Sequence, residues 1–144
     1  MRHILRKGDM DCGIACIAML AGVGYFEALK AFNDKESAVE KGNLAPALRD
    51  PLIKLGHQPA KRLTKFRVYD VSENDAILKV NPYNKGADWH WVAWDTERTR
   101  ILDPWRPRPY VKHYRPVGVL TTKRRSADVI GNAVHVMRIA KGGR

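Results

Sequence analysis

The sequence predicts an α+β fold in which N-terminal helices pack on an antiparallel sheet. Apolar residues recur at helical spacing before about residue 70, and short β-favouring runs replace them afterwards. The chain has 144 residues, 44% of them hydrophobic, which fits one globular domain and excludes intrinsic disorder for most of the chain. No apolar run is long enough to cross a membrane.

Apolar spacing and end signals predict the N-terminal helices. Residues 12–21 are small and apolar on nearly every side, which is typical of a buried helix. Asp9 and Asp11 are its candidate N-caps, and Gly22 and Gly24 are expected to end it. The other predicted elements of this half are a short helix at 25–32, a polar loop or frayed turn at 33–42 and a helix at 44–55, broken near Pro51.

β-favouring runs separated by turns predict the sheet. The aromatic run 89–94 and the run 99–102 flank a polar turn, so residues 89–103 are expected to form a β-hairpin. The predicted strands are 75–81, 89–95, 99–103 and 117–121. Residues 1–121 then form the folded domain, and 122–144 form a basic C-terminal tail in which 126–139 could be an amphipathic helix.

The positive charge is concentrated in the last third of the chain. Residues 1–97 hold 14 basic and 13 acidic side chains, whereas residues 98–144 hold 12 and 2, giving most of the net charge of +11. This excess indicates either a solvated surface or contact with an acidic partner. An acidic protein is favoured over nucleic acid, because no nucleic-acid-binding module is recognised. The candidate partner-binding residues are Arg106, Arg108, Lys123, Arg124 and Arg125.

The two cysteines, Cys12 and Cys16, are four residues apart, a spacing that suits neither a disulfide nor a CxxC redox pair. The N-terminus does not resemble a signal peptide, so a cytoplasmic location is expected. The five histidines show no metal-ligand spacing, and the sequence therefore predicts no metal and no other cofactor.

Three residues together predict nucleophilic catalysis. Cys12 begins the buried helix, where the helix dipole favours a thiolate, and Gly13 beside it would let a substrate approach the backbone. His90 and Asp103 lie on the two strands of the predicted hairpin, where an Asp can fix the tautomer of a His and stabilise the imidazolium. Cys16 is expected to be a small core residue. The prediction is a Cys12–His90–Asp103 triad.

Residues 11–20, D-C-G-I-A-C-I-A-M-L, closely resemble the D-C-G-x-A-C-x-A-M signature of the double-glycine leader peptidases. These are papain-like cysteine proteases, found in bacteriocin-exporting transporters and as stand-alone proteins. Segments around His90 and Asp103 resemble the family's other two blocks in order and spacing, 78 residues after Cys12 and then 13 further. The resemblance covers roughly residues 5–121 and implies a papain-like fold and cleavage of a peptide, which in this family occurs after Gly-Gly.

Arg6 departs from this family, which normally places a Gln six residues before the Cys to help form the oxyanion hole. Losing one oxyanion donor costs about 100- to 1000-fold in turnover. An Arg can still donate hydrogen bonds, so Arg6 and the backbone N–H of Cys12 are the candidate oxyanion donors. Two functions stay open: a cysteine peptidase or related thiol hydrolase, and a weakly active or inactive papain-like scaffold that binds an acidic partner through its basic last third.

Overall fold

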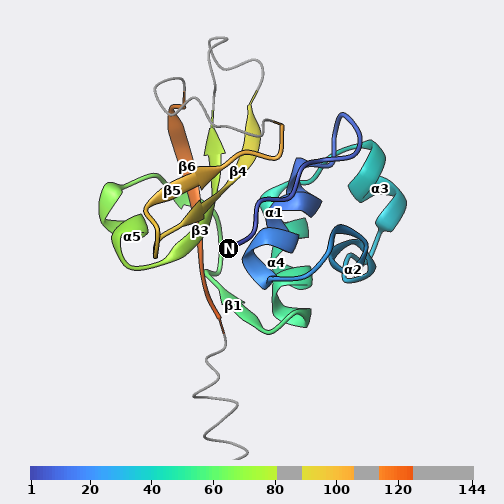
Figure 1. Cartoon of the computed structure of the whole chain (residues 1–144), viewed down its shortest axis with the longest axis horizontal. Helices are drawn as coiled ribbons and strands as arrows, with labels where there is room; N and C mark the ends of the chain where they lie inside the picture. Colours follow the sequence, from blue (N-terminus) through green and yellow to red (C-terminus); the bar gives the residue numbers. More distant parts are fainter. Residues whose placement is uncertain (81–88, 106–113, 125–144) are drawn as a thin grey trace, which may run out of the picture.

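The computed structural model describes residues 1–80, 89–105 and 114–124, and it confirms the α+β class. The helices of the first 54 residues gather on one side of the molecule, and most of the sheet lies on the other side together with the short helix at Val68–Ser72 (Figure 1). The first four helices are α1 (Cys12–Ala21), α2 (Tyr25–Lys30), α3 (Lys35–Glu40) and α4 (Ala45–Lys54). The elements that follow are β1 (His57–Pro59), β2 (Thr64–Lys65), α5 (Val68–Ser72), β3 (Asp75–Val80), β4 (His90–Asp95), β5 (Arg100–Leu102) and β6 (Pro116–Arg124).

The sheet is antiparallel, with the strand order β1-β6-β3-β4-β5, and β2 pairs with β6 beside β1. The predicted hairpin is present, since Ala93 of β4 is paired with Leu102 of β5. Because side chains alternate along a strand, the sheet contributes to two apolar clusters. One holds most of α1 together with Ile77, Trp91, Ala93, Leu102 and Leu120. The other holds Val71 with Ala76, Leu78, Val80, Val92, Ile101 and Val119.

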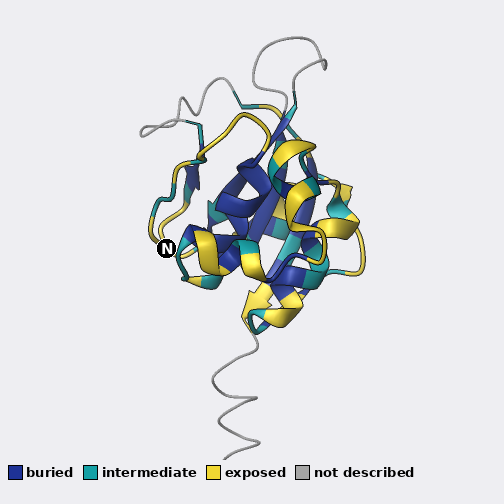
Figure 2. Cartoon of the chain, turned by 90° about the vertical axis from the view of Figure 1, so that its right-hand side faces the viewer, coloured by how far each residue is buried: buried dark blue, intermediate teal, exposed yellow. Residues whose placement is uncertain are grey.

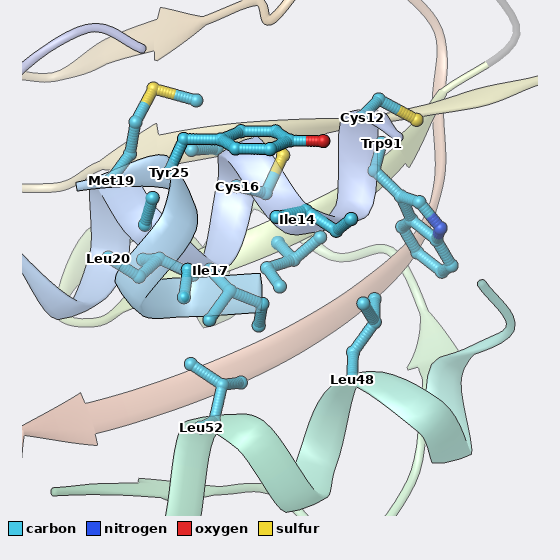
Figure 3. Close-up of a cluster of buried hydrophobic side chains, with 14 of the residues drawn as sticks. Cys12, Ile14, Cys16, Ile17, Met19, Leu20, Tyr25, Leu48, Leu52 and Trp91 are labelled. Carbon is cyan, nitrogen blue, oxygen red and sulfur yellow. The ribbon is translucent and has the colours of Figure 1, made fainter. Parts of the chain in front are cut away.

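Helix α1 is the centre of the first cluster, and nine of its ten residues are buried (Figures 2 and 3). Gly22 ends it as predicted, in a left-handed conformation (φ 71°) that favours glycine. Asp11 occupies the N-cap position, but its side chain makes no capping hydrogen bond. Its backbone oxygen accepts from the amides of Ile14 and Ala15 instead, and Asp9 is exposed.

Three expectations for the elements were wrong. The predicted polar loop contains α3, because the Asp34 carboxylate caps it by accepting from the Ser37 amide at 2.9 Å and Ala38 is buried. Helix α4 continues through Pro51, because Leu48, Pro51 and Leu52 are buried together on one side.

The third correction concerns β6, which runs three residues beyond its predicted end, since β1 pairs with it as far as His57 and Arg124. The proposed helix at 126–139 lies outside the described residues. No helix among the described residues is long and apolar enough to cross a membrane.

Candidate active site

Cys12 is the first residue of α1 and lies against β4. Its side chain sits beside Trp91 at the end of the helix (Figure 3). Cys12 is 8% exposed, and the Trp91 backbone amide is one of the groups that lower the pKa of its thiol, against the larger effect of burial. Trp91 directly follows His90 in β4. The packing of α1 on β4 therefore places Cys12 beside the strand that carries His90, the candidate base.

His90 and Asp103 meet as the hairpin predicts. His90 begins β4 and Asp103 directly follows β5, and the His90 Nε2 atom lies 3.5 Å from the Asp103 Oδ1 atom. Both side chains are at most 2% exposed. The distance is long for a hydrogen bond, and within the described residues neither ring nitrogen of His90 has a hydrogen-bond partner. The contact between the imidazole and the carboxylate is therefore electrostatic.

Asp103 is held by two further donors. The Tyr114 hydroxyl donates to its Oδ2 atom, and the Trp105 amide donates to its Oδ1 atom at 2.8 Å. Burial alone would raise the pKa of Asp103, but the contacts with His90, Tyr114 and the Trp105 amide outweigh it and hold the pKa below its usual range. Asp103 is thus a carboxylate at neutral pH, as an orienting group requires.

Trp105 covers the candidate base. Its ring is stacked on the His90 imidazole with centroids 4.1 Å apart and planes 9° apart. The Arg6 guanidinium lies over the same Trp105 ring, 4.7 Å from its centroid, and donates to the Asp9 carbonyl at 3.0 Å. These groups and the Asp9 carboxylate are its partners in the described part of the chain, and Cys12 is not among them. Among the described residues, Arg6 thus contacts Trp105, which is stacked on the candidate base His90, and does not contact the Cys12 thiol.

The N-terminal segment binds the turn that carries Asp103. The His3 Nε2 atom donates to the Asp103 carbonyl at 2.6 Å, and the Arg6 amide donates to the Pro104 carbonyl at 2.9 Å. Neither contact could be predicted from the sequence, because the partners are about 100 positions apart. Their effect is to fix the Asp103–Trp105 turn against the segment that leads into α1.

Asp11 organises the loop before Cys12. Its carboxylate is fully buried and accepts from the Lys7 amide at 2.9 Å, the Gly8 amide at 3.0 Å and the Tyr25 hydroxyl at 2.5 Å. Burial opposes its ionisation, but these donors outweigh burial and lower the pKa of Asp11. Asp11 is therefore a charged group directly before the candidate nucleophile.

The pKa of the Cys12 thiol is raised, opposite to the expectation from its helix position. Burial is the main cause, and the negative charges of Asp11 and Asp103 add to it, while the Trp91 and Gly13 backbone amides oppose it. Cys12 is therefore a neutral thiol at pH 7. A nucleophilic role then needs a base that removes the proton as the sulfur attacks.

Cys16 and Gly13 serve packing. Cys16 is fully buried one turn along α1, as expected, and both cysteines are free thiols. Gly13 is buried too, and a Cβ atom there would lie 3.0 Å from the Leu48 Cδ2 atom and 3.1 Å from the Asn43 Nδ2 atom. The missing side chain thus makes room for Leu48 and Asn43, and the expectation that it admits a substrate was wrong.

Lys123 and Arg124, two of the candidate partner-binding residues, are exposed at the end of β6. Arg106, Arg108 and Arg125 lie outside the described residues. Within residues 1–80, 89–105 and 114–124, no three His, Cys, Asp or Glu side chains are placed to hold a metal ion.

Comparisons of the chain with protein-family models, with curated proteins and with solved structures found no match. The site must therefore be interpreted from its own geometry and from the sequence motifs.

Proposed function

We propose that the protein is a thiol hydrolase, and specifically a cysteine peptidase with a papain-like fold similar to the double-glycine leader peptidases. The observation that carries the proposal is the buried contact of His90 Nε2 with the Asp103 carboxylate, beside Trp91, whose side chain lies next to Cys12 (Figure 3). A nucleophile, a base and an orienting carboxylate thus come from α1, β4 and the turn after β5.

In the proposed mechanism each ring nitrogen of His90 has its own task. With Nε2 facing Asp103, the proton of the neutral imidazole belongs on Nε2, and Nδ1 is left to act as the base. As Cys12 Sγ attacks the scissile carbonyl carbon, its proton passes to His90; this step requires the thiol and the imidazole to come into hydrogen-bond contact, because neither ring nitrogen of His90 has a partner among the described residues. That proton then leaves with the amine product, and water hydrolyses the resulting thioester.

The oxyanion formed in the attack needs hydrogen-bond donors. The Cys12 amide is in the first turn of α1, where backbone N–H groups have no acceptor within the helix. The Arg6 side chain donates to the Asp9 carbonyl and lies over the Trp105 ring, and no contact with Cys12 is found among the described residues. The proposed hole therefore rests on the Cys12 amide, and we expect slow turnover.

A peptide-cleavage assay on the full chain tests this function. The substrate is a synthetic peptide with an internal Gly-Gly, and cleavage is followed by mass spectrometry. Cys12→Ala and His90→Gln should each abolish cleavage, whereas Cys16→Ala should keep it. Iodoacetamide should label Cys12 and not Cys16. If iodoacetamide labelled the Cys12→Ala variant as much as the original chain, or if that variant cleaved the peptide, Cys12 would not be the nucleophile.

A second candidate function is binding by the same fold without catalysis. Two observations favour it: the raised pKa of Cys12 and the engagement of Arg6 with Trp105 and Asp9. This function predicts a folded protein whose Cys12 is not labelled faster than an unfolded cysteine and which cleaves no Gly-Gly peptide.

A further inference from the structure

One edge of the sheet carries exposed cations, which the alternation of side chains along β6 directs to both faces of the sheet. We define the basic edge as Lys61, Arg62, Lys65, Lys123 and Arg124, all of them exposed. Strands β1 and β2 both pair with β6 at this edge, with Gln58 opposite Lys123 and Lys65 opposite Gly118. The distance along β6 from Gly118 to Arg124 is about 20 Å at the usual rise of a strand.

The fold assembles this edge from two distant parts of the sequence. Three of its cations come from residues 61–65, in a part of the chain whose charges nearly balance, and two come from the basic last third. The bond from the Ala60 amide to the Thr121 carbonyl, at 2.8 Å, holds the two segments together. The sequence alone predicts a positive surface in the last third of the chain. The pairing of strands in the sheet adds the three cations of residues 61–65 to that surface.

The basic edge has no matching anions among the described residues. Neither residues 57–67 nor residues 116–124 contain an Asp or Glu, and in the part of the chain that the structure describes none of the five cations is in an ion pair. Asp75, on the neighbouring β3, accepts from the Thr96 amide instead. The helical side differs, since its charges alternate in sign and Lys54 pairs with Asp50 at 3.1 Å.

Exposed apolar side chains adjoin the Lys65 end of this edge. Val68 and Tyr69, which begin α5 three residues after Lys65, are each 73% exposed, and Val117 of β6 is 42% exposed. The Phe66 amide donates to the Val117 carbonyl, which places the start of α5 beside β6. An exposed apolar patch next to charged side chains is a composition found at protein–protein interfaces.

We propose that the basic edge, with Val68 and Tyr69, is a docking surface for an acidic segment of another protein. The unpaired cations select carboxylates, and the apolar residues supply an anchor that removes area from water. Protein is favoured over nucleic acid because Tyr69 is a single exposed aromatic beside aliphatic residues, whereas binding of single-stranded nucleic acid uses several stacking rings. This function does not depend on the proposed peptidase activity.

Fluorescence anisotropy with a labelled synthetic peptide rich in glutamate and leucine tests the surface on the full chain. The triple variant Lys61→Gln, Arg62→Gln, Lys65→Gln should bind at least tenfold more weakly at about 50 mM salt and show a shallower salt dependence. The matched control is Lys30→Gln, Lys41→Gln, Arg98→Gln, which removes three exposed charges elsewhere and should bind about as tightly as the original chain. Equal losses in both variants would overturn the proposal, because net charge alone would then explain binding.

A second variant separates the apolar anchor from the charges. Val68→Ser with Tyr69→Ser should weaken peptide binding severalfold and leave its salt dependence unchanged. If the triple variant has a low thermal midpoint, Lys123→Gln alone tests the same surface with a smaller change in charge. Tighter binding of a DNA duplex than of the peptide would reassign the surface to nucleic acid, and no peptide binding at low salt would refute the docking surface. Cys12 labelling by iodoacetamide should be unchanged in every variant.

Discussion

Trp105 lies flat against the His90 imidazole, 4.1 Å from centroid to centroid. The same tryptophan amide donates to Asp103, whose carboxylate faces the Nε2 atom of that imidazole. One residue therefore fixes both the plane of the candidate base and the position of its orienting group. This makes Trp105 a positioning residue in the proposed mechanism.

Replacing Trp105 by Ala should lower peptide cleavage by about 10- to 100-fold, because small misplacements of a catalytic group have costs of this size. Trp105→Phe keeps an aromatic plane and should recover most of the rate. The measurement is kcat for the Gly-Gly peptide, together with the thermal midpoint of each variant. A rate loss that follows only the loss of stability would contradict the positioning role.

Arg6→Gln restores the side chain that the resembled family uses in the oxyanion hole. If the carboxamide introduced at position 6 donates to the oxyanion, kcat should rise by at least about tenfold, since a single such donor can contribute more than this. Arg6→Met removes the charge without supplying a donor and should not raise the rate. An equal change in both variants would mean that position 6 acts only by its contact with Trp105.

Asp11→Asn should lower the pKa of the Cys12 thiol, because it removes a negative charge that disfavours the thiolate. The rate of Cys12 alkylation by iodoacetamide, measured against pH, should then rise at a lower pH than in the original chain. The variant should also lose about 1–3 kcal/mol of stability, since an Asn cannot satisfy all three donors. Tyr25→Phe is the control that keeps the charge of Asp11, and it should not lower the midpoint of the alkylation profile.

His57 should make the protein less stable in mild acid. Burial lowers its pKa, and the positive charge of Arg124 adds to this, so the unfolded chain binds a proton more readily than the folded one. The contribution of His57 to the stability of the protein is complete above the pKa of histidine in the unfolded chain, about 6.5. It declines as the pH falls through that value toward the lower pKa of His57 in the folded protein. Urea unfolding at about pH 7.5 and about pH 5.5 measures this slope, and His57→Gln should remove most of it. A slope unaffected by that substitution would assign the effect to another group.

Gly13→Ala should destabilise the protein by about 1–3 kcal/mol, the usual cost of overpacking. The new Cβ atom would lie 3.0 Å from Leu48 and 3.1 Å from Asn43, so one of them must move. In a Leu48→Ala background, which itself loses stability because Leu48 is fully buried, the additional cost of Gly13→Ala should be smaller, as a double-mutant cycle of unfolding free energies would show. Full stability of the single variant would mean that Asn43 shifts freely.

The α+β class, the helix at Cys12 and the hairpin with His90 and Asp103 were predictable because each depends on local pattern. The helix is apolar on every side, and the hairpin strands are short aromatic or apolar runs around a polar turn. The placement of His90 beside Asp103 then follows from antiparallel pairing, without knowledge of the rest of the fold.

What could not be predicted depends on contacts between distant residues. The pairing of His57 with Arg124 joins two polar ends that carry no strand pattern. Trp105 and Tyr114 had only a Pro-rich or basic neighbourhood in the sequence, and their role comes from the contacts with His90 and Asp103. The direction of the Cys12 pKa was missed because its main cause, burial, is a property of the folded state.

The burial of α1 also constrains the order of events during synthesis. The helix leaves the ribosome first, but it packs with Trp91, Leu102 and Leu120 in one cluster. The chain needs about 5–20 s to add the roughly 100 residues between Ala21 and Leu120 at ordinary elongation rates. Throughout that interval an apolar helix lacks these partners from its own chain, so part of its apolar surface stays exposed until the sheet is made.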